Sequence, residues 1–154
     1  MIERVISGGQ TGVDRAALDV ALRLDIPCGG WCPHGRFAED GRIPAIYPLN
    51  ETPNREYAQR TLWNVRDADA TLVLATAAPE GGTAYTLACA KQMGKPFFTA
   101  DLLQQPRVEP VVAWLKDNRV RVLNVAGPRE STSPGVHQLA ADFLATLLAE
   151  VGRV

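Results

Sequence analysis

The feature that most constrains the fold is a regular alternation of short β-type runs with longer segments of helical periodicity. Short apolar runs, such as residues 71–75, fit strands that are buried on both faces of a parallel sheet. Residues 13–24 instead repeat apolar side chains at helical spacing. This alternation predicts βαβ units and a parallel sheet covered by helices. The expected strands are residues 3–7, 26–31, 71–75, 96–100 and 121–125.

Helical patterns fill the stretches between and after these runs, at residues 13–24, 57–65, 83–93, 108–115 and 139–151. We therefore predict an α/β fold, a Rossmann-like three-layer α/β/α sandwich with a mainly parallel sheet of five or more strands. The chain has 154 residues and 46% hydrophobic content, and it shows neither an internal repeat nor a linker. One domain spanning residues 1–154 is the expected organisation.

Charge and apolar patterning exclude several classes of function. The chain carries 16 basic and 17 acidic residues, which leaves a formal charge of -1 and argues against nucleic-acid binding. No apolar run approaches the roughly 20 residues that a membrane span needs. The opening Met-Ile-Glu-Arg does not resemble a secretory leader, and three cysteines give no disulfide framework. We expect a cytoplasmic protein without a membrane partner.

Glycine-rich segments follow the predicted strands, at residues 8–14, 32–41, 79–83 and 126–131. Strand-to-helix loops of a parallel sheet share one edge, and ligands bind there. The first of these loops opens a helix, where glycines let backbone N–H groups approach an anion. Residues 32–53 form one long irregular stretch, which is often functional in a compact domain. The sequence therefore predicts an anion site built from several loops.

The first loop excludes two common ligands. It lacks the Gly-Lys-Ser/Thr ending of a P-loop, which argues against ATP hydrolysis of that type. It is also an imperfect dinucleotide motif, because Ser7 stands where the first glycine belongs. The acidic residue that would hold a ribose is missing after the second strand, where residues 31–34 read Trp-Cys-Pro-His.

The candidate ligand-binding residues are glycines with exposed amides, and hydroxyl, amide, carboxylate and guanidinium side chains from these loops. Backbone N–H groups and hydroxyls at a helix start bind oxyanions, and a guanidinium matches phosphate geometry. The candidates are Gly8, Gly9, Gln10, Thr11, Gly12, Asp14, Arg15, Arg36, Gly81, Gly82, Thr83, Gly127, Arg129 and Ser131.

Proton transfer and metal binding have weaker sequence support. Asp14 and Glu80 lie in the ligand-side loops and are the candidate general bases. Cys28, Cys32 and His34 have a C-x3-C-x-H spacing, but the second ligand pair of a structural zinc site is missing. We predict no bound metal.

Long motifs spread over nearly the whole chain resemble the "putative molybdenum carrier" family. They are residues 7–15 (SGGQTGVDR), 30–36 (GWCPHGR), 38–41 (AEDG), 47–53 (YPLNETP), 63–67 (WNVRD), 81–83 (GGT) and 124–131 (NVAGPRES). That family resembles a wider Rossmann-like group that includes the "lonely guy" cytokinin-activating phosphoribohydrolases. The resemblance implies a homo-oligomer with a ligand pocket at the Gly-rich loops. It also implies molybdenum cofactor, a phosphate-bearing pterin, as the carried ligand.

The phosphoribohydrolases share a Pro-Gly-Gly-x-Gly-Thr-x-x-Glu motif, and Gly81-Gly82-Thr83 matches its core. Aligned at that threonine, the final glutamate falls on Thr86, so the catalytic carboxylate of the motif is missing. This favours a carrier for a phosphate-bearing, nucleotide-like ligand over an enzyme. The alternatives are a small nucleotide-processing hydrolase or transferase that uses Asp14 or Glu80, and a nucleotide-sensing regulatory domain.

Overall fold

The computed structural model describes residues 1–104 and 106–152. Its centre is a sheet of five strands that all run parallel, in the order β2-β1-β9-β7-β8. The strands of this sheet are β1 (Arg4–Ile6), β2 (Cys28–Gly29), β7 (Ala70–Ala75), β8 (Phe97–Asp101) and β9 (Val122–Ala126).

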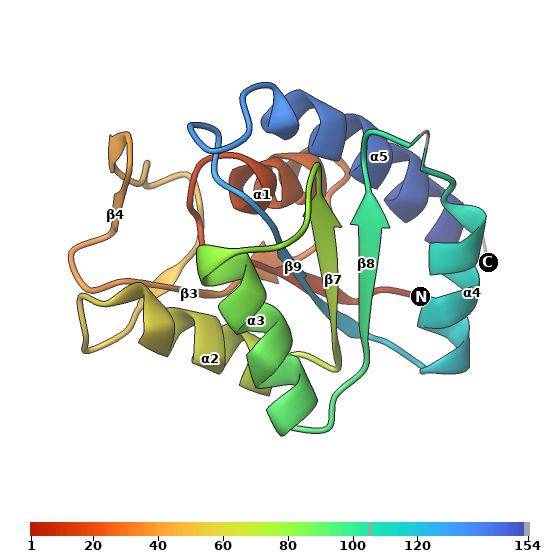
Figure 1. The fold of residues 1–154 in the computed structure, drawn as a ribbon, viewed down its shortest axis with the longest axis horizontal. Helices are drawn as coiled ribbons and strands as arrows, with labels where there is room; N and C mark the ends of the chain where they lie inside the picture. The colour runs from red at the N-terminus through yellow and green to blue at the C-terminus, as the bar shows by residue number, and fades with distance from the viewer. Residues whose placement is uncertain (105, 153–154) are drawn as a thin grey trace.

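Helices cover both faces of the sheet, which makes the fold a Rossmann-like three-layer sandwich (Figure 1). Helices α1, α4 and α5 pack on one face, and α2 and α3 pack on the other. Their bounds are α1 (Val13–Arg23), α2 (Tyr57–Asp67), α3 (Gly81–Gln92), α4 (Glu109–Asp117) and α5 (Val136–Val151). The predicted fold class is confirmed, and each predicted helix lies within a few residues of its expected place.

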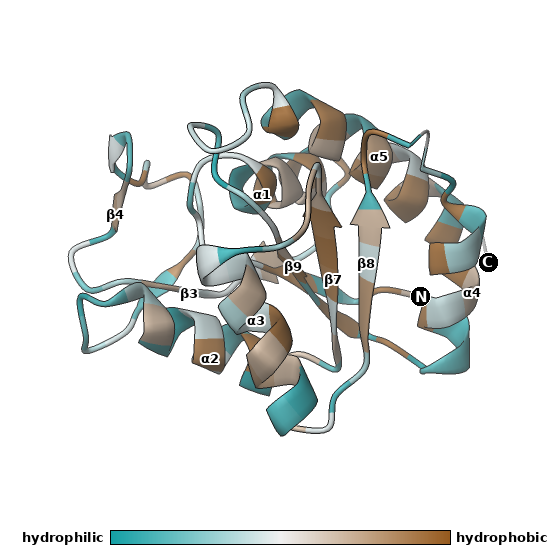
Figure 2. Cartoon of the chain, viewed as in Figure 1, coloured by the Kyte–Doolittle hydropathy of each residue, from teal (hydrophilic) through white to brown (hydrophobic). Residues whose placement is uncertain are grey.

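Burial explains why these segments take these structures. All six residues of β7 are buried, as an apolar strand covered on both faces requires. Figure 2 shows the carboxyl-terminal part of β7 as strongly apolar, whereas the helices carry apolar and polar faces. Leu144 and Leu147 of α5 pack with Val20 of α1 in the main core. Across the described residues, no helix combines the length and apolar character that a membrane span would need.

The second predicted strand, residues 26–31, is divided in the structure. Its first part is β2, and Trp31 and Cys32 form β3, which pairs with β6 (Asn50–Glu51) in a separate two-stranded sheet. Gly30 makes the break with a φ of +125°, and a Cβ there would lie 2.3 Å from the carbonyl oxygen of Ser7. The chain leaves the main sheet at this glycine because no other residue fits the turn.

The long segment at residues 32–53 is an ordered excursion. It contains a short antiparallel hairpin of β4 (Phe37–Ala38) and β5 (Gly41–Arg42). A small second core, in which Ile43 and Leu49 pack against Leu18 of α1, anchors its base. The prediction of a segment without regular structure therefore missed the hairpin.

The strand order relates this sheet to a known topology. If the last unit, β9 and α5, is placed first in the count, the order β2-β1-β9-β7-β8 reads 3-2-1-4-5. That is the order of a doubly wound nucleotide-binding sheet, in which ligands bind where the winding reverses. In this chain the reversal lies between β9 and β7.

Candidate functional site

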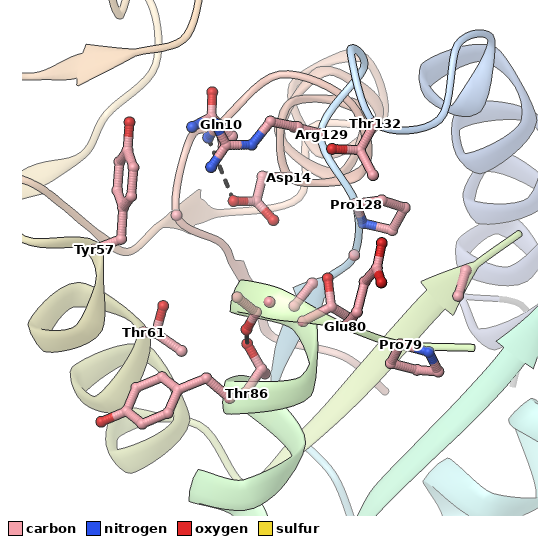
Figure 3. Close-up of a pocket in the computed structure, with 18 of the residues that line it drawn as sticks. Gln10, Asp14, Tyr57, Thr61, Pro79, Glu80, Thr86, Pro128, Arg129 and Thr132 are labelled. Atoms are coloured by element: carbon pink, nitrogen blue, oxygen red, sulfur yellow. Dashed lines mark hydrogen bonds between the residues drawn. The ribbon is translucent and has the colours of Figure 1, made fainter. Parts of the chain in front are cut away.

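A pocket of about 780 Å³ opens at the carboxyl ends of β7 and β9, where the strand order reverses (Figure 3). Its walls come from α2, from the loop and helix start after β7, and from the loop after β9. The volume lies in the usual range for small-molecule sites, and the position is the one that open α/β sheets use. The pocket therefore opens at the edge of the sheet where the sequence predicted a ligand site.

The wall after β7 is the start of α3. Gly81 has a φ of +54°, and a Cβ at Gly81 or Gly82 would meet no atom within 4 Å. Glu80, the N-cap residue, makes no capping hydrogen bond with its side chain. The amides of this helix start therefore face a pocket with nothing packed over the glycines, which suits an anion.

The wall after β9 brings together Gly127, Arg129 and Ser131, all of which line the pocket. A Cβ at Gly127 would lie 2.2 Å from the carbonyl oxygen of Leu74, so glycine lets this loop cross β7 closely. The Arg129 side chain is 38% exposed, and its guanidinium lies 5.5 Å from the ring centroid of Tyr57. A partly exposed cation thus lies at the rim of the pocket.

The floor contains a buried ion pair between the first loop and α2. Asp14 Oδ2 lies 3.3 Å from Arg60 Nη1 and accepts a hydrogen bond from the Gln10 amide. Burial raises the pKa of Asp14, and the charge of Arg60 opposes that shift. A Cβ at Gly8 would lie 1.7 Å from Arg60 Nη1, so Gly8 makes room for the guanidinium.

Two buried nitrogen atoms at this floor, Gln10 Nε2 and Arg60 Nε, have no hydrogen-bond partner among the described residues. The orientation of the Gln10 amide is fixed, because its Oε1 accepts hydrogen bonds from the backbone N–H groups of Thr11 and Glu39. Both unpaired atoms are therefore donors, and both residues line the pocket.

Other members of the first loop serve its packing. Gly9 and Gly12 both have a φ of +80°. A Cβ at Gly9 would lie 2.5 Å from Leu49, and one at Gly12 would lie 2.4 Å from the carbonyl oxygen of Pro128. These glycines allow the loop to pass between the excursion and the loop after β9, and neither lines the pocket.

The tip of the β4–β5 hairpin contacts the remaining polar residues of these loops. Asp40 accepts two hydrogen bonds from Arg15, at 2.7 and 3.2 Å. The Glu39 carboxylate accepts hydrogen bonds from the hydroxyls of Thr11 and Ser131. Thr11 and Arg15 do not line the pocket, whereas Ser131 does.

The structure does not bring Arg36 to the pocket. Its guanidinium donates hydrogen bonds to the backbone carbonyls of Ile43, Pro44, Tyr47 and Leu49, at 2.9 to 3.4 Å. Arg36 therefore organises the excursion, and nothing in the sequence separated that role from phosphate binding.

The predicted acid–base residues have different surroundings. Asp14 lies at the pocket floor, and Glu80 lies at its exposed rim. Thr86 lines the pocket too, but its hydroxyl donates a hydrogen bond to the Gly82 carbonyl within α3. Glu130 caps α5, because its carboxylate accepts hydrogen bonds from the amides of Gly135 and His137.

The polar side chains that α2 contributes to the lining were not predicted from sequence; they are Tyr57, Arg60, Thr61 and Asn64. Arg60 and Asn64 are buried although they are polar. One turn apart on the same face, they mark a helix side that packs against polar surroundings. The four-residue spacing of Arg60 and Asn64 was the available sequence signal for a site on α2, since a buried polar face on an amphipathic helix is uncommon.

The cysteines and His34 do not line the pocket. Cys32 is buried and His34 is exposed. Among the described residues, no group of three or more His, Cys, Asp or Glu side chains is arranged to hold a metal ion.

A doubly wound sheet with a pocket at its switch point, lined by both apolar and polar residues, defines a Rossmann-like ligand-binding protein as the structural class. Residues 5–148 match the model of the circularly permutated YpsA SLOG family, and the chain belongs to that family. The permuted strand order described above is the structural counterpart of that description.

A crystal structure from Syntrophus aciditrophicus has the same fold, with a TM-score of 0.91 and 43% sequence identity. The match covers 96% of this chain and 95% of that one, and the protein is described as a "putative molybdenum carrier protein". A comparison with curated proteins gave no match.

Proposed function

We propose that residues 1–154 form a binding or carrier domain for a phosphate-bearing, nucleotide-like small molecule. The observation that carries the proposal is the pocket at the switch point between β9 and β7. The start of α3 supplies free amides for the anion, and Arg129 supplies a guanidinium at the rim.

Molybdenum cofactor is the leading ligand within this proposal. The similar protein from Syntrophus aciditrophicus is described as a "putative molybdenum carrier". A pterin with a phosphate tail needs anion-binding groups for the phosphate and polar groups that face the ring. The unpaired donors of Gln10 and Arg60 fit a ring that carries acceptor atoms, because such a ring would relieve the cost of leaving them unpaired. The cargo is then bound by Gly81, Gly82, Thr83, Gly127, Arg129 and Ser131.

A binding panel tests this proposal. The natural protein is titrated by calorimetry with nucleoside mono- and diphosphates, their dephosphorylated nucleosides and a molybdopterin preparation. We expect at least one phosphorylated compound to bind, and Arg129→Ala to weaken it more than its dephosphorylated form. Equal losses for both forms would argue against a phosphate role for Arg129, and a panel without any binder would reject the proposal. A cytoplasmic location and a homo-oligomeric state belong to the same proposal.

One observation favours the second candidate, a nucleotide-processing hydrolase or transferase. Asp14 lines the pocket, and burial raises its pKa, as is common for groups that transfer protons. In this alternative Asp14 would move a proton, while Glu80 would act from the rim.

The two candidates differ in what Asp14→Asn does. If Asp14 transfers a proton, the variant keeps its ligand affinity and loses turnover of a nucleotide substrate, which is measured by product formation. If Asp14 only holds Arg60 in place, the ligand affinity of the variant falls, and neither the natural protein nor the variant turns over the nucleotide.

A further inference from the structure

The hairpin tip places a carboxylate on the donor groups that a bound anion would use. Glu39 accepts hydrogen bonds from the Ser131 backbone N–H at 3.1 Å and from the hydroxyls of Ser131 and Thr11. Its Oε2 also lies 3.9 Å from Arg129 Nη1. A backbone amide, two hydroxyls and a guanidinium are the groups with which proteins bind phosphate.

Two of the three residues that supply these donors belong to the pocket. Arg129 and Ser131 line it, whereas Glu39 and Thr11 stand outside its lining. Glu39 therefore contacts Arg129 and Ser131 of the loop after β9 without lining the cavity itself. Hydrogen bonds from Ser131 and Thr11 lower the pKa of Glu39, so its carboxylate is charged where it meets them.

We infer that Glu39 is an internal anion that competes with the ligand's phosphate for Arg129 and Ser131. This inference rests on the proposed function and adds a regulation of the same site. When a phosphate enters, Arg129 turns into the pocket and Ser131 donates hydrogen bonds to the phosphate. The Glu39 carboxylate then loses part of its contacts with these two residues. The Glu39 side chain is then released, while Asp40 stays paired with Arg15 and the base of the hairpin stays in place.

The anchoring of the hairpin supports release at the tip alone. Arg36 ties the base to four backbone carbonyls, and Ile43 and Ala38 are buried in the small second core. The hairpin tip consists of Glu39 and Asp40, which are exposed and make the side-chain contacts, and the adjoining strand β5 is exposed as well. Loss of the Glu39 contacts therefore need not unfold the excursion.

The test compares two variants that each remove one negative charge from the same hairpin tip. Glu39→Gln removes the competing anion, and Asp40→Asn removes a carboxylate that pairs with Arg15, outside the pocket. The probes are inorganic pyrophosphate and the tightest nucleotide of the panel, titrated by calorimetry. Thermal unfolding of each variant checks that it is folded.

We expect E39Q to bind pyrophosphate about two- to fivefold more tightly than the natural protein, the range for losing a partly exposed ion pair. D40N should bind as the natural protein does. In the natural protein, saturating pyrophosphate should also speed amide hydrogen exchange of residues 39–42.

Unchanged or weaker binding by E39Q, with normal binding by the natural protein, would overturn the competition and leave Glu39 as a positioning residue. Equal gains in E39Q and D40N would overturn it too, because they would reflect net charge alone. If the natural protein and both variants bind no probe, the proposed function fails and this inference fails with it.

Discussion

The Asp14–Arg60 pair shows what a single residue contributes at this site. Both side chains are about nine-tenths buried, and each is the charged neighbour of the other at the pocket floor. Taking charges out of water is costly, so removing one partner leaves the other uncompensated. The pair therefore couples the stability of the first loop to the side of α2.

Arg60→Met should lower the free energy of unfolding by about 3 kcal/mol, because it leaves a buried carboxylate without its cation. Adding Asp14→Asn should restore much of that loss. Urea unfolding of the single and double variants measures both effects. Additive losses in the double variant would show that the two charges do not interact.

At the residue scale, the sequence predicted which kinds of side chain gather in the loops, but it did not predict what each loop residue does. Gly9, Gly12, Thr11, Arg15 and Arg36 all looked like ligand groups in isolation. The structure gives Arg36 four carbonyl partners and gives Gly12 a backbone neighbour in a loop more than a hundred residues away. A glycine or an arginine serves packing and anion binding equally well, and only the neighbours separate these roles.

At the scale of elements, two glycines in the pocket walls have opposite surroundings. A Cβ at Gly127 would strike the backbone of β7, whereas one at Gly82 would meet no atom within 4 Å. Gly127 thus holds the loop after β9 against the sheet, and Gly82 leaves the start of α3 open.

Gly127→Ala should cost about 1–3 kcal/mol of stability, since the loop must move off β7 to relieve the contact. Gly82→Ala is the matched control and should be neutral or slightly stabilising, because alanine favours a helix. Thermal or urea unfolding measures both. The larger Gly82→Val should still fold and lose ligand affinity by crowding the anion. A stable Gly127→Ala protein would contradict the proposed close approach.

Asp69 lies in the turn between α2 and β7, and its side chain bonds to the start of β9. Its carboxylate accepts hydrogen bonds from the amides of Arg121 and Val122, at 2.9 and 2.8 Å. These bonds lower the pKa of Asp69, with the Val122 amide as the largest cause. A lowered folded-state pKa stabilises the protein above the unfolded value of about 3.9, and the effect is lost as pH falls through the folded value.

Asp69→Asn should therefore lower stability at pH 7 by about 1 kcal/mol, after allowance for the exposure of this carboxylate. The difference from the natural protein should shrink as the pH falls below about 4. Urea unfolding at pH 7 and pH 3 provides the comparison. A difference of the same size at both values would exclude a role for the charge.

At the scale of the whole molecule, the unusual strand order reduces to a change in where the chain begins. Moving β9 and α5 to the front restores the order 3-2-1-4-5 without altering any strand neighbour. The two ends of the described chain also lie on the same side of the molecule (Figure 1).

A circular permutant should therefore fold. Residues 1 and 152 are joined by a flexible Gly/Ser linker of about eight residues, and the chain is opened between Asn118 and Arg119, which are exposed. We expect cooperative unfolding and pyrophosphate affinity close to that of the natural protein. A cut inside β7 is the control and should abolish folding. A permutant without cooperative unfolding would show that the connection between α4 and β9 is needed.

The sequence by itself determined the layered α/β class, the approximate positions of α1 to α5 and the edge of the sheet at which the pocket opens. Those follow from the periodicity of apolar residues and from loop composition, which are local properties. Strand order, the choice of β7 and β9 as the pocket strands, and the entry of α2 into the site were decided only in three dimensions. They depend on contacts between segments far apart in the chain, such as Asp14 with Arg60 and Glu39 with Ser131, which no local pattern encodes.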